Sequence, residues 1–104
     1  MSESLVRIGS LGDFPDGSMK KVQVHDEDVL VANISGKIYA MGDECTHRGC
    51  SLSEGTIEGT TVICPCHEGR FDITTGKVTA SPPERDEPSY AVQLQGSDVL
   101  VKKR

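Results

Sequence analysis

Residues 45–67 read CTHRGCSLSEGTIEGTTVICPCH, and this stretch contains all four cysteines and two of the three histidines of the chain. They form two short groups, C-T-H-R-G-C at 45–50 and C-P-C-H-E-G at 64–69. Each group offers a thiolate and an imidazole in the pattern C-x-H, sixteen residues, C-x-x-H. In a chain without a recognisable secretion signal, cysteines and histidines clustered in this way favour a metal site over a disulfide framework.

Short runs rich in valine and isoleucine surround the two groups and alternate with glycine, aspartate, asparagine and serine. Such runs are typical of strands, and no segment has sustained helical periodicity. The predicted strands are Leu5–Ile8, Lys20–His25, Val29–Ile34, Lys37–Met41, Thr56–Glu58, Thr61–Ile63, Arg70–Ile73, Lys77–Val78, Tyr90–Leu94 and Asp98–Lys102. The sequence therefore predicts an all-β fold, a small antiparallel sandwich or barrel in which each Cys/His group lies on a loop that follows a strand. The segments 12–17 and 80–88, which contain proline, are predicted loops.

Length and composition predict one small domain with a thin core. The chain has 104 residues, 36% of them hydrophobic, with two Phe, two Tyr and no Trp. That length fits a single domain over residues 1–104, and so few aromatic side chains leave little apolar surface to bury. We therefore expect the metal site to contribute to folding.

The charge balance and the hydropathy pattern exclude several classes of protein. The formal net charge is −5, from 11 basic and 16 acidic side chains, which argues against a nucleic-acid partner. No apolar run approaches the roughly 20 residues of a membrane helix. The first residues, Met1–Ser4, have neither the basic nor the apolar segment of a secretion signal. We therefore expect a cytoplasmic protein without a membrane anchor.

The Cys/His pattern and its neighbours closely resemble those of the Rieske family of [2Fe–2S] proteins. Beyond the four ligand positions, the matching residues are Thr46, Gly49, Cys50, Pro65, Cys66, Phe71-Asp72 and Pro82-Pro83. The resemblance implies a small Rieske-like sandwich with two cluster-binding loops and one [2Fe–2S] cluster per chain. It places Cys45 and Cys64 on one iron, and His47 and His67 on the other. Two neutral imidazoles in place of two thiolates raise the potential of such a cluster, to between about −150 and +300 mV.

Two further cysteines, Cys50 and Cys66, stand beside the predicted ligands. In the high-potential branch of the family these positions form a disulfide, and the resemblance implies the same bond here. The alternative is a pair of small buried thiols in a reducing compartment.

A departure from the high-potential pattern concerns the reduction potential. High-potential members have a serine and a tyrosine whose hydroxyls donate hydrogen bonds to the cluster sulfurs, and this chain has Gly69 and Phe71 there. Neither side chain donates a hydrogen bond, and such donors stabilise the added electron. We therefore expect a potential below that of the cytochrome bc type.

The resemblance implies a soluble one-electron carrier that passes electrons from a reductase to an oxygenase. We expect no catalytic residues, because an oxygenase iron needs two histidines and a carboxylate. His25 is the only histidine outside the predicted ligands and is expected to be a solvated turn residue. A fixed small subunit of a larger oxidoreductase, as in nitrite reductase, is the alternative. A structural zinc module is a further alternative, although zinc pairs usually read C-x-x-C or H-x-x-x-H.

Overall fold

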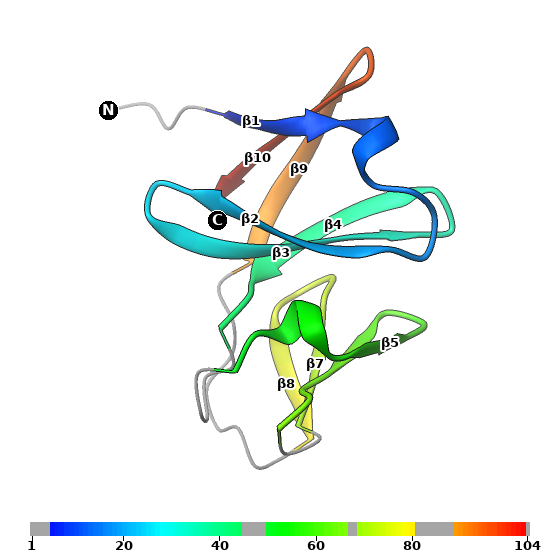
Figure 1. The fold of residues 1–104 in the computed structure, drawn as a ribbon, viewed down its shortest axis with the longest axis vertical. Helices are drawn as coiled ribbons and strands as arrows, with labels where there is room; N and C mark the ends of the chain where they lie inside the picture. Colours follow the sequence, from blue (N-terminus) through cyan, green and yellow to red (C-terminus); the bar gives the residue numbers. More distant parts are fainter. Residues whose placement is uncertain (1–4, 45–49, 67–68, 81–88, 104) are drawn as a thin grey trace.

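A computed structural model describes residues 5–44, 50–66, 69–80 and 89–103. In these ranges the chain forms ten strands and two short 3-10 helices (Figure 1). The elements are β1 (Val6–Ser10), η1 (Leu11–Asp13), β2 (Met19–Val24), β3 (Glu27–Ile34), β4 (Lys37–Gly42), η2 (Leu52–Glu54), β5 (Thr56–Glu58), β6 (Thr61–Ile63), β7 (Arg70–Asp72), β8 (Lys77–Ala80), β9 (Ser89–Gln95) and β10 (Asp98–Lys103). Every predicted strand is present, with its ends displaced by two residues at most. Among the described residues, no helix is long and apolar enough to cross a membrane.

The strands form two antiparallel sheets. The larger has the order β1-β10-β9-β4-β3-β2 and the smaller the order β5-β6-β7-β8. β1 comes close to β2, so the larger sheet nearly closes on itself. Figure 1 shows the smaller sheet and η2 below the strands of the larger sheet. The prediction of an all-β antiparallel fold is therefore confirmed.

Two of the hairpin turns consist of residues with positive φ. Ser35 and Gly36 join β3 to β4 with φ values of 55° and 87°. His25 and Asp26 join β2 to β3 with φ values of 48° and 68°. Two successive residues of positive φ match the twist of the flanking strands, which is why short hairpins use them. His25 is exposed at this turn, as predicted.

The predicted loops are partly corrected by the structure. Residues 12–17 are not wholly irregular, because η1 extends over Leu11–Asp13, where the Asp13 carboxylate accepts a hydrogen bond from the backbone N–H of Ser10 at 3.0 Å. This local capping stabilises a single turn too short to show periodicity in the sequence. Ala80 belongs to β8 rather than to a loop. The rest of the predicted 80–88 loop, including Pro82 and Pro83, lies outside the described residues.

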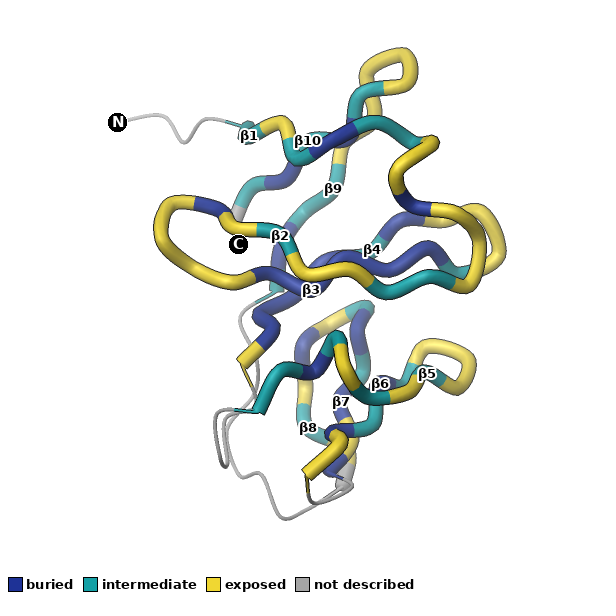
Figure 2. The backbone as a smooth tube through the Cα atoms, viewed as in Figure 1, coloured by how far each residue is buried: buried dark blue, intermediate teal, exposed yellow. Residues whose placement is uncertain are grey.

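Strand β3 separates two hydrophobic cores. Its Val29 and Val31 belong to the first core, inside the curved larger sheet, together with residues such as Phe14, Ile38, Ala40, Tyr90, Val99 and Val101. The intervening Leu30 and Ala32 face the second core, which also contains Met41, Leu52, Val62, Cys64, Phe71 and Ile73. A strand buried on both faces has a continuous apolar run instead of an alternating one. Figure 2 shows this buried strand between the two layers.

A buried tyrosine links β9 to β3. Tyr90 is 4% exposed and donates a hydrogen bond from its hydroxyl to Glu27 Oε1 at 3.2 Å. Burial, and then the Glu27 carboxylate, raise the pKa of Tyr90 to about 12. The phenol of Tyr90 is thus a weaker acid in the folded chain than in the unfolded chain. Below pH 10 both chains keep the phenolic proton.

We expect this tyrosine to make the protein less stable as the pH rises from about 10 to about 12, because only the unfolded chain readily releases the proton there. The free energy of urea unfolding, measured between pH 9 and pH 12, should fall less steeply for Tyr90→Phe than for the wild type. Equal slopes for the two proteins would contradict the assignment.

Candidate metal centre

Both predicted ligand loops begin at the edge of the second core and are closed by backbone pairing. Glu44 and Ser51 form an isolated antiparallel bridge on either side of the first loop. The Cys64 backbone N–H donates to the Gly69 carbonyl at 2.7 Å and closes the second loop. Residues 45–49, with the predicted ligands Cys45 and His47, lie outside the described residues, as do residues 67–68 with His67.

Cys64 is the predicted ligand that the structure describes. It is a free cysteine, 1% exposed, and belongs to the second core with Leu52, Val62 and Phe71. Its backbone N–H donates to the Gly69 carbonyl, so this residue belongs both to the second core and to the base of the second loop. A buried, unoxidised thiol on a short closed loop fits a soft metal centre.

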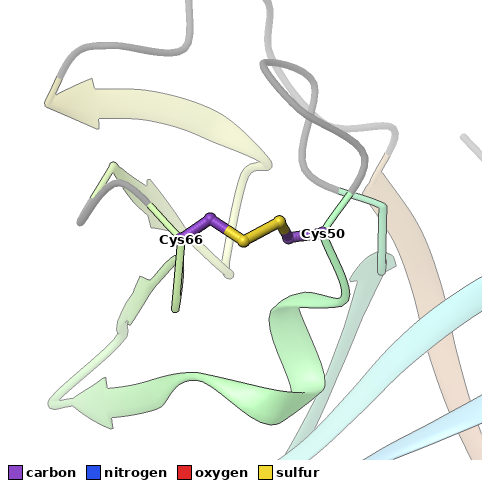
Figure 3. The surroundings of a disulfide bond; sticks show 2 residues. All are labelled: Cys50 and Cys66. Carbon is purple, nitrogen blue, oxygen red and sulfur yellow. A yellow bond between two sulfur atoms is a disulfide. The ribbon is translucent and has the colours of Figure 1, made fainter.

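Cys50 and Cys66 form a disulfide with a Cα–Cα distance of 6.5 Å (Figure 3). The prediction of this pairing is confirmed. Cys50 follows the first ligand loop directly, and Cys66 lies inside the second loop between the Cys64 and His67 positions. The bond therefore holds together the two loops that carry the predicted ligands, one thiolate and one imidazole on each.

Asp43 is a buried residue at the base of the first loop that the sequence analysis did not single out. It is 2% exposed, and its two carboxylate oxygens accept hydrogen bonds from the Ser51 hydroxyl at 2.5 Å and the Ser53 backbone N–H at 2.8 Å. The sequence feature that could have indicated this contact is an aspartate two residues before the first Cys/His group, with serines after that group. The pattern alone does not show that these residues meet.

Gly55 is a second residue that the sequence analysis missed. A Cβ atom at this position would lie 2.0 Å from the carbonyl oxygen of Ile63 and 3.1 Å from Cδ of Pro65. These two residues flank Cys64 in the sequence. The backbone after η2 thus lies directly against the start of the second ligand loop, and only glycine leaves room for this contact.

We expect Gly55→Ala to destabilise the protein by about 1–3 kcal/mol and to displace the second loop, because backbone atoms cannot move out of the way as a flexible side chain can. Urea unfolding and the rate of metal loss to a chelator measure the two effects. Gly12→Ala is the matched control, since nothing lies within 4 Å of a Cβ there. Equal effects of the two substitutions would show that the contact at Gly55 relaxes without cost.

The comparisons with known proteins extend over nearly the whole chain. The Rieske [2Fe-2S] domain family matches residues 4–95. The ferredoxin component of the naphthalene 1,2-dioxygenase/salicylate 5-hydroxylase systems of Ralstonia sp is 33% identical over 102 residues, which cover 98% of each protein. The ferredoxin component of the biphenyl 2,3-dioxygenase of Rhodococcus jostii is 38% identical over 98 residues, which cover 94% of this chain and 92% of that protein.

A solved structure is similar as well. One chain in the complex of reduced oxygenase and oxidized ferredoxin in carbazole 1,9a-dioxygenase has a TM-score of 0.90 to this chain. The sequence identity is 29%, and the match covers 99% of this chain and 98% of that one. The similarity in structure thus extends over both sheets.

Proposed function

This chain belongs to the Rieske [2Fe–2S] domain family, and we propose that it is a ferredoxin component that carries single electrons from a reductase to an oxygenase. The observation that carries the proposal is its similarity, over nearly its whole length, to ferredoxin components of dioxygenase systems. A similar chain in a solved complex of oxygenase and ferredoxin supports an oxygenase as the acceptor. Redox partners of this kind usually meet through small, transient interfaces.

The ligand set follows from the two loops. Cys45 and Cys64 would hold one iron and His47 and His67 the other, so that each loop gives one thiolate and one imidazole. The disulfide between Cys50 and Cys66, and the burial of the free Cys64 thiol, support this assignment. When bound, the cluster supplies a centre that accepts and releases one electron.

The residues around Cys64 would favour electron transfer in two ways, by excluding water and by holding the two loops in place. The apolar side chains of the second core, among them Leu52 and Phe71, exclude water from one side of the thiol. The disulfide and the backbone hydrogen bond from Cys64 to Gly69 hold the two loops in one arrangement. Fixed ligands need to move little when the charge of the centre changes, and the fold supplies that fixation.

The chain is a carrier and not itself an oxygenase. After His47 and His67 are assigned to the cluster, the remaining histidine is His25, which lies exposed at the turn between β2 and β3. We place the protein in the cytoplasm as one domain, with no nucleic-acid partner and no membrane attachment, from its acidic charge and its hydropathy pattern.

The proposal is tested by an absorption spectrum, by EPR after dithionite reduction and by reconstitution. A red-brown protein with a [2Fe–2S] signal of average g below the free-electron value is expected. It should support turnover when mixed with the reductase and oxygenase of an aromatic-ring dioxygenase system. A colourless protein with stoichiometric zinc would overturn the proposal. A cluster-containing protein that is not reduced by any such reductase would refute the carrier role alone.

We expect the pair of substitutions Gly69→Ser and Phe71→Tyr to raise the reduction potential. Phe71 is fully buried and belongs to the same core as Cys64, so Phe71→Tyr introduces a hydroxyl into the core that contains this predicted ligand. A hydrogen bond that favours the reduced centre by about 1.4 kcal/mol shifts a one-electron potential by roughly 60 mV. Voltammetry measures the shift, and Phe14→Tyr, in the first core, is the matched control. A pair that leaves the potential unchanged would contradict the argument.

A further inference from the structure

Asp43 is the only charged residue among the fully buried side chains that the structure describes. It directly follows β4, which delivers the chain to the first ligand loop, and it precedes Cys45 by two residues. Its backbone N–H donates to the Asp28 carbonyl at 3.1 Å, and its backbone carbonyl accepts from the Leu52 N–H at 2.7 Å. A buried carboxylate costs free energy unless hydrogen bonds satisfy it, so this residue needs an explanation.

The hydrogen bonds of the carboxylate have a definite direction. An ionised carboxylate only accepts, so the Ser51 hydroxyl uses its single proton on Asp43 Oδ2. The contact between the hydroxyls of Ser51 and Ser53, at 2.8 Å, then has Ser53 as its donor. Since the Ser53 backbone N–H donates to Asp43 Oδ1, the three residues form a closed ring of hydrogen bonds. We call this ring the Asp43 clip.

The clip holds the first ligand loop at both ends. Asp43 stands before the loop, while Ser51 and Ser53 follow it, and the Glu44–Ser51 bridge lies between them. Leu52, between the two serines, is fully buried in the second core beside Cys64. Cys50, next to Ser51, is bonded to Cys66 in the second loop. The clip therefore connects the core, the first loop and the disulfide.

We propose that Asp43 is a positioning residue of the metal centre, which fixes the first ligand loop through Ser51 and Ser53 and places a negative charge beside the cluster. The inference rests on the proposed function, because it assumes a cluster on the two loops. The charge is shielded from water, so salt screens it poorly. It opposes the addition of an electron nearby and thus lowers the reduction potential.

Two substitutions separate the two effects. Asp43→Asn keeps the shape and the bond from the Ser53 N–H but removes the charge, and the amide donates to the Ser51 hydroxyl instead of accepting from it. Ser51→Ala keeps the charge and breaks the ring. We expect Asp43→Asn to raise the potential measured by voltammetry. We expect Ser51→Ala to lose its iron to a chelator roughly ten to a hundred times faster than the wild type, without a rise in potential.

Asp28→Asn is the matched control for the charge. The side chain of Asp28 is exposed, while its backbone carbonyl accepts a hydrogen bond from the Asp43 N–H. Asp28→Asn therefore removes the same charge near Asp43, but from a side chain in solvent. A rise in Asp43→Asn no larger than in this control would overturn the role of the charge. Wild-type rates of iron loss in both Ser51→Ala and Asp43→Ala would overturn the role in positioning, and Ser51→Ala serves alone if Asp43→Ala does not fold. The visible spectrum of the wild type tests the cluster itself, so its absence would refute the proposed function instead.

Discussion

Replacing Cys64 by serine is expected to give a colourless protein that contains no iron and unfolds at a much lower temperature. The thiol is 1% exposed at the edge of the second core, and a serine hydroxyl is not a thiolate ligand. The chain has only two Phe and two Tyr, so we expect metal binding to contribute to the folding free energy. We expect a loss of roughly 4 kcal/mol or more, the range of a lost metal site. Iron analysis and thermal unfolding followed by circular dichroism measure the two effects.

The wild type stripped of its iron is the control for this substitution. If the cluster supplies the lost stability, the stripped wild type and Cys64→Ser should unfold at similar temperatures. Cys45→Ser should behave in the same way, which also tests a ligand that lies outside the described residues. A Cys64→Ser protein that keeps both its iron and its unfolding temperature would contradict the ligand assignment.

The second large effect is expected from the double substitution Cys50→Ser and Cys66→Ser. The bond joins residues with a sequence separation of 16, and closing a loop of that size stabilises a protein by about 3 kcal/mol in the chain-entropy model. For a domain of this size the midpoint of thermal unfolding should fall by roughly 12–24 °C. The iron should also be lost faster, because the two ligand loops are no longer tied together.

Treatment of the wild type with dithiothreitol gives an independent measure of the same effect. The reduced wild type and the double variant should have similar unfolding temperatures and similar rates of iron loss. A double variant as stable as the oxidised wild type would show that the pairing contributes nothing to stability. A variant that is less stable but keeps its iron as long as the wild type would limit the bond to a structural role.

Local sequence patterns were sufficient to predict the strands. The apolar runs and the turn at Ser35-Gly36 depend on neighbours in the sequence, and the structure contains every predicted strand. The Cys50–Cys66 pairing followed from a family resemblance, and it is confirmed. The Asp43 clip and the contact of Gly55 with Ile63 were not predictable, because they join segments that meet only after both sheets have packed. The ligand roles of Cys45, His47, Cys64 and His67 stay predictions.

The order of strands in the larger sheet places the segment with the predicted ligands between two neighbouring strands. Although residues 43–88 lie between them in sequence, β4 and β9 are neighbours that pair through Ala40 with Tyr90 and Met41 with Ser89. Residues 43–88, which contain the predicted ligands, thus leave and re-enter the larger sheet at neighbouring strands, and the pairing of these strands brings the two ends of the segment together. The entropy of closing such a segment depends only weakly on its length. Its length can therefore vary at little entropic cost while the pairing of β4 with β9 stays the same.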